Sequence, residues 1–343
     1  MGEFELIERY FKQPARAHAH SGAIVLGIGD DCALLQPDPG MQLAVSTDML
    51  VEGRHFLPDV DPEALGHKAL AVNLSDLAAM GAEPMGFTLA LALPVERAND
   101  AAWLRAFSGG LLALGDKHGC ALVGGDTTGG PLNICITVFG QLPVGQALRR
   151  DGAHVGDDIW VSGELGGARL GLGALRGEWA LPAAIEAAAR QRLERPIPRL
   201  ALGRALRSVA SACADVSDGL AGDLGHILKA SGVGASLDAE RILTMTPFRA
   251  LMTKAGVPSE DDEWLAMALT GGDDYELVFT APPASRVAVQ TAAQLASTAV
   301  TRVGRIESNL GLRLTGTDGQ PRAFAARAFD HFATATDSPT GQS

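Results

Sequence analysis

The stretch Ala121-Leu122-Val123-Gly124-Gly125-Asp126-Thr127-Thr128 joins a short apolar run to a polar segment built around Gly and Asp. The apolar run predicts a strand, and Gly-Gly-Asp predicts a turn after it. Four further segments place Asp beside Gly, Ser or Thr in the same way, at 27–31, 46–48, 215–219 and 271–276. These units alternate with helical patterns along the chain, which predicts an α/β (α+β) fold.

Helical periodicity is clearest in 3–12, in 62–80 and over about 18 residues from Ala101. Shorter helical patterns cover 199–210 and 219–231. Strand-like runs are predicted at 24–28, 43–47, 87–93, 134–140, 158–162, 235–237, 275–280 and 301–306. A polar segment at 144–156 separates two α/β halves. We predict an N-terminal domain at 1–148, a C-terminal domain at 149–333 and a disordered tail at 334–343.

Composition excludes several classes of protein. The net charge of −12 argues against a nucleic-acid-binding surface, which needs clustered Lys and Arg. The longest nearly apolar stretch, 86–94, is far short of a membrane span, and the acidic, amphipathic N-terminus does not read as a signal peptide. None of the four cysteines forms a CxxC pair, which disfavours a zinc site. A soluble, cytoplasmic protein with no membrane partner is expected.

The common nucleotide-binding and hydrolase motifs are missing from the sequence. It has no GxxxxGK[ST], HExxH or GxSxG and no HRD/DFG pair. The segment at 27–32 begins like a dinucleotide-binding fingerprint but has no third glycine.

The aspartates suggest a different way to bind phosphate. Asp76 interrupts an apolar helical stretch and is expected to face inward, while the other aspartates lie in the Gly-containing segments. Mg²⁺ takes few protein carboxylates per ion and completes its shell with water and phosphate oxygens. Each segment alone is also typical of an ordinary turn. Together they favour several Mg²⁺ ions on a polyphosphate, which Arg150 and His55 could complement.

The sequences of these motifs resemble those of the thiamine-monophosphate kinase family, and the resemblance extends from Gly2 to about Phe332. The segments that carry the resemblance are Gly2-Glu-Phe, GIGDDCALL (27–35), STDMLVEGRHF (46–56), HKALAVNLSDLAAMGAEP (67–84), GGDTT (124–128), DVSDGLAGDLGHI (215–227), GGDDYEL (271–277) and FDHF (329–332). The aspartate segments alone would indicate only the wider superfamily of aminoimidazole ribonucleotide synthetase-like ATP-binding proteins.

The resemblance implies a two-domain aminoimidazole ribonucleotide synthetase-like fold and a homodimer that pairs through its N-terminal sheets. It implies ATP and thiamine monophosphate as substrates, with several Mg²⁺ ions, and it leaves a K⁺ requirement open. The implied magnesium ligands are Asp31, Ser46, Thr47, Asp48, Asp76, Asp126, Asp215 and Asp218. The implied ATP contacts are Gly125, Asp126, Arg150 and Ser217, and the implied thiamine phosphate contacts are His55, Asp273 and Phe329. The family pattern has Glu where this chain has the shorter Asp273.

The expected reaction is direct in-line phosphoryl transfer without a side-chain nucleophile, the final step of thiamine diphosphate synthesis. Other superfamily enzymes are the nearest alternative. Two of them use a reactive Cys, one in an N-terminal Gly-rich segment and the other at the C-terminus. This sequence ends in Gly-Gln-Ser and has no Cys after Cys213, so both are expected to fit poorly. A non-catalytic nucleotide-binding regulator is the alternative from another class. Such a protein would be expected to lose some metal ligands, whereas every implied position is filled here.

Overall fold

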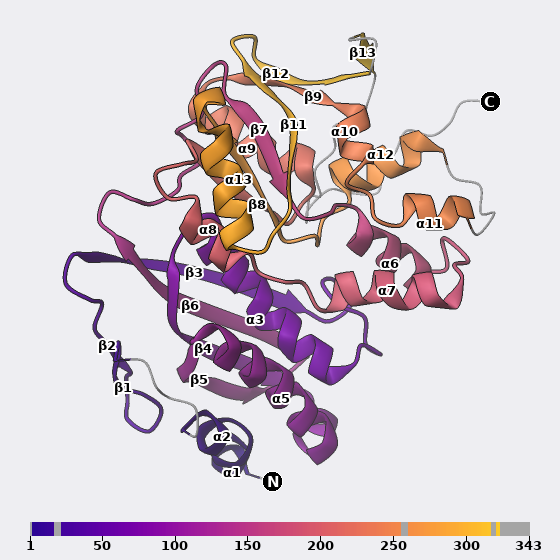
Figure 1. Ribbon diagram of the computed structural model, residues 1–343. Helices are drawn as coiled ribbons and strands as arrows, with labels where there is room; N and C mark the ends of the chain where they lie inside the picture. The colour runs from indigo at the N-terminus through magenta and orange to yellow at the C-terminus, as the bar shows by residue number, and fades with distance from the viewer. Residues whose placement is uncertain (1, 17–21, 255–259, 317–319, 323–343) are drawn as a thin grey trace.

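The computed structural model describes residues 2–16, 22–254, 260–316 and 320–322. Two sheets organise the chain, one in each half, and the long helix α3 lies between them (Figure 1). The N-terminal sheet has the strand order β3 (Met41–Val51), β6 (Asn133–Pro143), β4 (Glu83–Leu93) and β5 (Ala121–Gly129). Helices α3 (Pro62–Ala79) and α5 (Ala101–His118) cover one face of this sheet.

Capping and glycine packing fix these two helices. Asp61 begins α3 by accepting a hydrogen bond from the Ala64 N–H at 2.8 Å, and Asp100 caps α5 in the same way. The helices then approach closely: a Cβ on Gly110 would lie 1.9 Å from the carbonyl oxygen of Glu63. Only glycine allows this contact, which locks α5 against α3 over the sheet.

The C-terminal sheet is larger and better covered. Its strand order is β13 (Pro321–Arg322), β12 (Gly311–Thr315), β9 (Gly234–Asp238), β11 (Val300–Glu307), β7 (Asp158–Ser162), β10 (Glu276–Ala281) and β8 (Ala212–Val216). Every residue of β7, β8 and β10 is buried. Strands buried on both faces read as continuous apolar runs. Strands were predicted at 158–162 and 275–280, where β7 and β10 lie.

The remaining elements complete these two layers. In the N-terminal half they are α1 (Glu3–Ile7), a π-helical segment (Glu8–Lys12), α2 (Gln13–Arg16), β1 (Ile24–Leu26), β2 (Leu34–Leu35) and α4 (Val95–Ala98). In the C-terminal half they are α6 (Gly167–Leu175), α7 (Ala183–Glu194), α8 (Leu200–Ala205), α9 (Leu220–Ser231), α10 (Ala239–Leu243), α11 (Arg249–Lys254), α12 (Asp261–Thr270), a 3₁₀ turn (Pro283–Ser285) and α13 (Arg286–Leu295). The predicted domain boundary at 148/149 falls between β6 and β7.

Two turn predictions were wrong. Gly124–Thr128 lies inside β5, which pairs in parallel with β4 as far as Gly129, and Ser46–Asp48 lies inside β3. Hydrogen bonding to neighbouring strands overrides the local turn tendency of Gly and Asp. The helix predicted at 199–210 ends at Ala205, and the elements α10, α11, α12, α13 and β12 were not predicted. Phe329 and the predicted tail lie outside the described residues.

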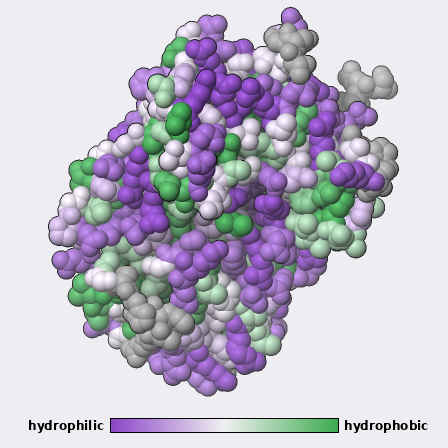
Figure 2. Space-filling model, viewed as in Figure 1, coloured by the Kyte–Doolittle hydropathy of each residue, from purple (hydrophilic) through white to green (hydrophobic). Residues whose placement is uncertain are grey.

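Most of the molecular face in Figure 2 is hydrophilic, and hydrophobic side chains gather there only in smaller groups. Among the described residues, no helix combines the length and the apolar character needed to cross a membrane.

Candidate functional site

A cavity of about 580 Å³ lies between the two domains and collects predicted site residues from both. We call it the acidic cavity. Its lining includes four predicted magnesium ligands and three predicted ATP or substrate contacts. These residues are Asp48, Asp76, Asp215, Asp218, Ser217, His55 and Asp273. Residues almost 230 positions apart in the sequence therefore share one space.

Hydrogen bonds from α3 and β3 hold the carboxylates of the acidic cavity. The Ser46 hydroxyl donates to Asp76, and the Ser75 hydroxyl donates to Asp215 at 2.8 Å. The backbone N–H of Asp48 donates to the Asn73 side-chain oxygen at 3.1 Å. Ser75 and Asn73 were not predicted as site residues. Their only signal in the sequence is a pair of polar residues inside the apolar pattern of α3.

Burial and mutual repulsion make this cluster electrostatically unfavourable without cations. Burial, together with the charges of Asp76 and Asp218, raises the pKa of Asp48 to about 6. Burial and the neighbouring acids, led by Asp76, also raise the pKa of Asp215. Arg150 partly compensates, because its charge lowers the pKa of Asp76 against the larger effect of burial. The charge of Arg150 therefore reaches Asp76, but Arg150 is not among the residues that line the acidic cavity, and its contact with ATP stays a prediction.

Carboxylate and hydroxyl oxygens are the hard ligands that Mg²⁺ prefers, so the residues present suit this ion. No three His, Cys, Asp or Glu side chains within the described ranges converge on a single point that could hold a metal. That arrangement agrees with ions that take one or two carboxylates each and complete their shells with phosphate and water.

Two predicted ligands lie elsewhere, in a second cavity of about 540 Å³ that extends across the N-terminal sheet from Leu43 in β3 to the edge strand β5. We call it the edge cavity. Asp31 and Asp126 line it together with Gly125. Gly125 has φ of 146°, and a Cβ there would lie 1.9 Å from the carbonyl oxygen of Leu89. Glycine is therefore required for β5 to reach its register with β4.

Strand register explains why the ligands separate. Residues that pair across neighbouring strands point to the same face of a sheet. Asp48 pairs with Ile136, which pairs with Leu89, and both of these residues are buried on the face that the helices cover. Asp126 belongs to the row of Met49, which is 52% exposed on the other face. Asp48 and Asp126 also lie on opposite edge strands, roughly 14 Å apart at one strand spacing per step. Within one chain they cannot hold the same ion.

Thr47 lies on the same face of the sheet as Asp126. We call this the open face, because α3 and α5 cover the opposite one. The Thr47 hydroxyl is 2.8 Å from that of Thr137. The predicted ligands Ser46, Thr47 and Asp48 thus point alternately to the two faces of β3, as successive strand residues must.

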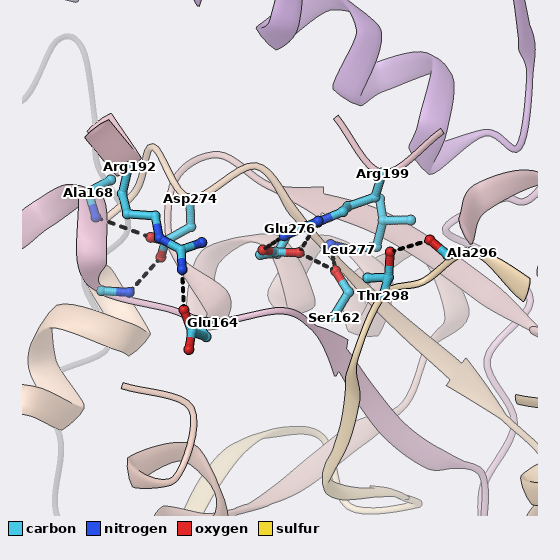
Figure 3. Close-up of polar contacts among 11 residues, drawn as sticks. Ser162, Glu164, Ala168, Arg192, Arg199, Asp274, Glu276, Leu277, Ala296 and Thr298 are labelled. Atoms are coloured by element: carbon cyan, nitrogen blue, oxygen red, sulfur yellow. Dashed lines mark hydrogen bonds and ion pairs between the residues drawn. The ribbon is translucent and has the colours of Figure 1, made fainter. Parts of the chain in front are cut away.

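The segment GGDDYEL gives its three acids three separate tasks. Asp273 lines the acidic cavity and adopts a left-handed backbone with φ of 62°. Asp274 accepts a hydrogen bond from the Gly166 N–H at 2.8 Å at the start of α6, and burial raises its pKa to about 8. Glu276 forms a buried ion pair with Arg199 and accepts from Ser162 at 2.5 Å (Figure 3). This geometry supports Asp273, rather than Asp274, as the substrate contact.

A third and narrower cavity, of about 50 Å³, adjoins the acidic cavity. We call it the apolar cavity, because Phe56, Leu57, Leu65 and Leu193 contribute to its wall. The buried Lys68 also lines it and forms an ion pair with Asp273 at 2.7 Å across the domain boundary. Sequence reasoning missed Lys68, whose signal is a lysine on the buried side of an apolar helix.

Comparison with known proteins matches both halves of this fold to one superfamily. Residues 29–142 match the N-terminal domain of AIR synthase related proteins, and residues 154–316 match the C-terminal domain.

The relatives narrow this assignment. Thiamine-monophosphate kinase of Salmonella typhimurium is 46% identical over 97% of this chain and 99% of its own length. The crystal structure of thiamine-monophosphate kinase from Stenotrophomonas maltophilia is 45% identical, with a TM-score of 0.81, and covers 94% of this chain and 98% of its own. The structure of AaThiL complexed with AMPPCP and TMP is 31% identical, with a TM-score of 0.71, over 96% of this chain and 97% of its own. The chain therefore belongs to the thiamine-monophosphate kinase family.

Proposed function

We propose that the acidic cavity transfers the terminal phosphoryl group of ATP directly to thiamine monophosphate, with several Mg²⁺ ions bound to aspartates. The chain is an enzyme, a kinase that uses ATP and forms thiamine diphosphate. The observation that supports the site most strongly is the convergence of Asp48, Asp76, Asp215 and Asp218 beside the predicted substrate contacts His55 and Asp273. We propose the cytoplasm, where ATP is available, as the compartment of this reaction.

Each group of residues has a proposed task in this reaction. Asp48, Asp76, Asp215 and Asp218, with Ser46, would hold Mg²⁺, which neutralises the charge of the phosphates when it is bound. Arg150 and Ser217 would contact ATP, and His55 and Asp273 would orient the acceptor. No side-chain nucleophile is needed, because the acceptor phosphate is already anionic and the main barrier is repulsion between two anions.

Homodimerisation would complete the site. Leu43, Val45 and Met49 leave an apolar surface on the open face of the N-terminal sheet, where they are 49%, 55% and 52% exposed. Both β3 and β5 are edge strands of that sheet. Pairing two such sheets edge to edge would cover the open faces and close eight strands into a barrel.

That pairing would also reunite the magnesium ligands. If β3 lies beside β5 of a second copy, then Gly125 and Asp126 of that copy come within one strand spacing, roughly 5 Å, of Thr47 and Asp48 of the first. Asp126 would share the open face with Thr47, while Asp48 stays on the helix-covered face, so the two acids would hold different ions of one site. Asp31, which shares the edge cavity with Asp126, would follow it. The active site would thus be built from two chains, and each dimer would hold two sites.

A direct assay tests the reaction. Purified protein with ATP, Mg²⁺ and thiamine monophosphate should form thiamine diphosphate and ADP in equal amounts, and EDTA should abolish turnover. ATP labelled in its terminal phosphate should leave no acid-stable label on the protein in a single turnover. A labelled protein intermediate would contradict direct transfer, and thiamine diphosphate below detection would contradict the function. Replacing K⁺ by Na⁺ in the same assay shows whether K⁺ is required.

A further inference from the structure

The acidic cavity and the apolar cavity share one wall. Five residues line both spaces: Arg54, His55, Leu172, Arg176 and Asp273. An acceptor that extends from the apolar cavity toward the metal-binding aspartates must pass this wall. Its phosphate would then lie beside the guanidinium groups of the wall.

Most cations around the two cavities already have carboxylate partners. Lys68 is paired with Asp273 at 2.7 Å, Arg190 with Glu194 at 2.9 Å and Arg169 with Glu178 at 2.5 Å. Their charges are largely compensated within the protein. An additional dianionic group would compete with those carboxylates for them.

Arg176 differs from these cations. Its side chain is exposed, and across the described ranges no hydrogen bond or ion pair joins its guanidinium group to another residue. A guanidinium group presents a rigid fork of N–H donors that matches a phosphate in a bidentate manner. Arg54, the other arginine of the wall, already interacts with another group of the protein. Arg176 is therefore the cation of the wall best able to accept a new anionic partner.

The end of α6 holds Arg176 at this position. The backbone N–H of Arg176 donates to the Leu172 carbonyl at 3.0 Å, and the N–H of Glu178 donates to the Gly173 carbonyl at 2.8 Å. Gly177, with φ of 72°, provides the left-handed residue that terminates the helix. The side chain thus starts from a fixed point on the rim of both cavities.

We propose that Arg176 binds the phosphate of the acceptor and so selects thiamine monophosphate over thiamine. This inference rests on the proposed function, because it assumes that the acceptor lies across the shared wall. Arg176 would thus determine the specificity for the phosphorylated acceptor, and it would not bind the metal ions.

The test compares two ligands that differ only by the phosphate. Calorimetric titration with thiamine monophosphate and with thiamine, in the presence of Mg²⁺ and a non-hydrolysable ATP analogue, is carried out on the wild type and on Arg176→Gln. The variant should lose about 10- to 100-fold in affinity for thiamine monophosphate, because charge-assisted hydrogen bonds are removed. Its affinity for thiamine should stay within about twofold, and Arg176→Lys should restore part of the loss.

The matched control is Arg190→Gln, since Arg190 lines only the apolar cavity and is paired with Glu194. It should keep the preference for the phosphorylated ligand. An unchanged preference in Arg176→Gln, or an equal loss for both ligands, would overturn the role of Arg176. A wild type that bound both ligands equally, and formed no thiamine diphosphate, would overturn the proposed function with it.

Discussion

Asp48 and Asp126 belong to the same four-stranded sheet, yet their surroundings differ in almost every respect. Asp48 lies between the domains, where Asn73 binds its backbone and where burial and neighbouring acids raise its pKa to about 6. Asp126 is exposed at the opposite edge, on the face of the sheet that points away from α3 and α5. One half of the ligand set is thus organised within a single chain, whereas the other half lacks its counterpart until a second chain supplies it.

The largest expected effect is on catalytic activity, when either Asp48 or Asp126 is replaced. Asp48→Asn and Asp126→Asn should each lower kcat by about 10³-fold, because each removes a charge that stabilises the metal-bound phosphates. Steady-state assays at saturating ATP measure this loss. Asp100→Asn, which keeps the cap of α5, is the matched control and should retain full activity. Near-normal turnover in either site variant would remove that residue from the site.

The next prediction concerns the open sheet face. Val45→Asp introduces a charge into the proposed dimer interface, so it should dissociate the dimer and lower activity by about 10- to 100-fold through loss of the shared site. Sedimentation velocity measures the mass, and the assay measures activity in the same samples. Val95→Asp, on the exposed surface of α4, is the control and should remain dimeric. Full activity in a monomeric Val45→Asp protein would contradict a shared site.

A smaller effect should follow from the hydrogen bonds behind the aspartates. Ser75→Ala removes the donor to Asp215 and should weaken Mg²⁺ activation by about 10-fold, since groups that support metal ligands tune metal affinity. The apparent Mg²⁺ constant comes from initial rates at varied Mg²⁺. Ser108→Ala, which removes a buried hydroxyl in α5 that bonds only to backbone carbonyls, should leave that constant unchanged.

The smallest expected effect is on stability and depends on pH. The folded-state pKa of Asp48 is raised, so its contribution to stability is present below about pH 4 and is lost as the pH rises through about 6. In EDTA, the Tm of Asp48→Asn relative to wild type should therefore increase by a few degrees between pH 4 and pH 7. Ser108→Ala, which removes no titratable group, should show no such trend. A pH-independent difference for Asp48→Asn would contradict the repulsion within the acidic cavity.

Local sequence signals were sufficient for much of the fold. Asp61 and Asp100 cap α3 and α5 where the predicted helices begin, and β7 occupies the predicted residues 158–162. The same signals could not show which face of the sheet Asp126 takes, because that depends on strand order and register. They also could not separate Asp273 from Asp274, whose tasks follow from partners more than 100 positions away, such as Gly166.

The resemblance to a family predicted the magnesium ligands. It did not predict that these ligands lie in two separate cavities of one chain. Only the strand order β3-β6-β4-β5 places Asp48 and Asp126 on opposite edges. The short polar residues Asn73 and Ser75 were passed over for a related reason. Their function depends on the backbone N–H of Asp48 in β3 and the carboxylate of Asp215 in β8, which reach α3 only in the folded chain.

Mixed dimers test the central claim, that two chains build each site, most directly. Asp48→Asn and Asp126→Asn chains with different affinity tags are produced together, and dimers carrying both tags are isolated. If sites are shared, one of the two sites in each mixed dimer has every ligand, and activity should recover to about half that of the wild type. Mixed dimers of Asp48→Asn with Asp76→Asn, both from the acidic cavity, should stay inactive. Mixed Asp48→Asn and Asp126→Asn dimers that remain as inactive as their parents would contradict the shared site.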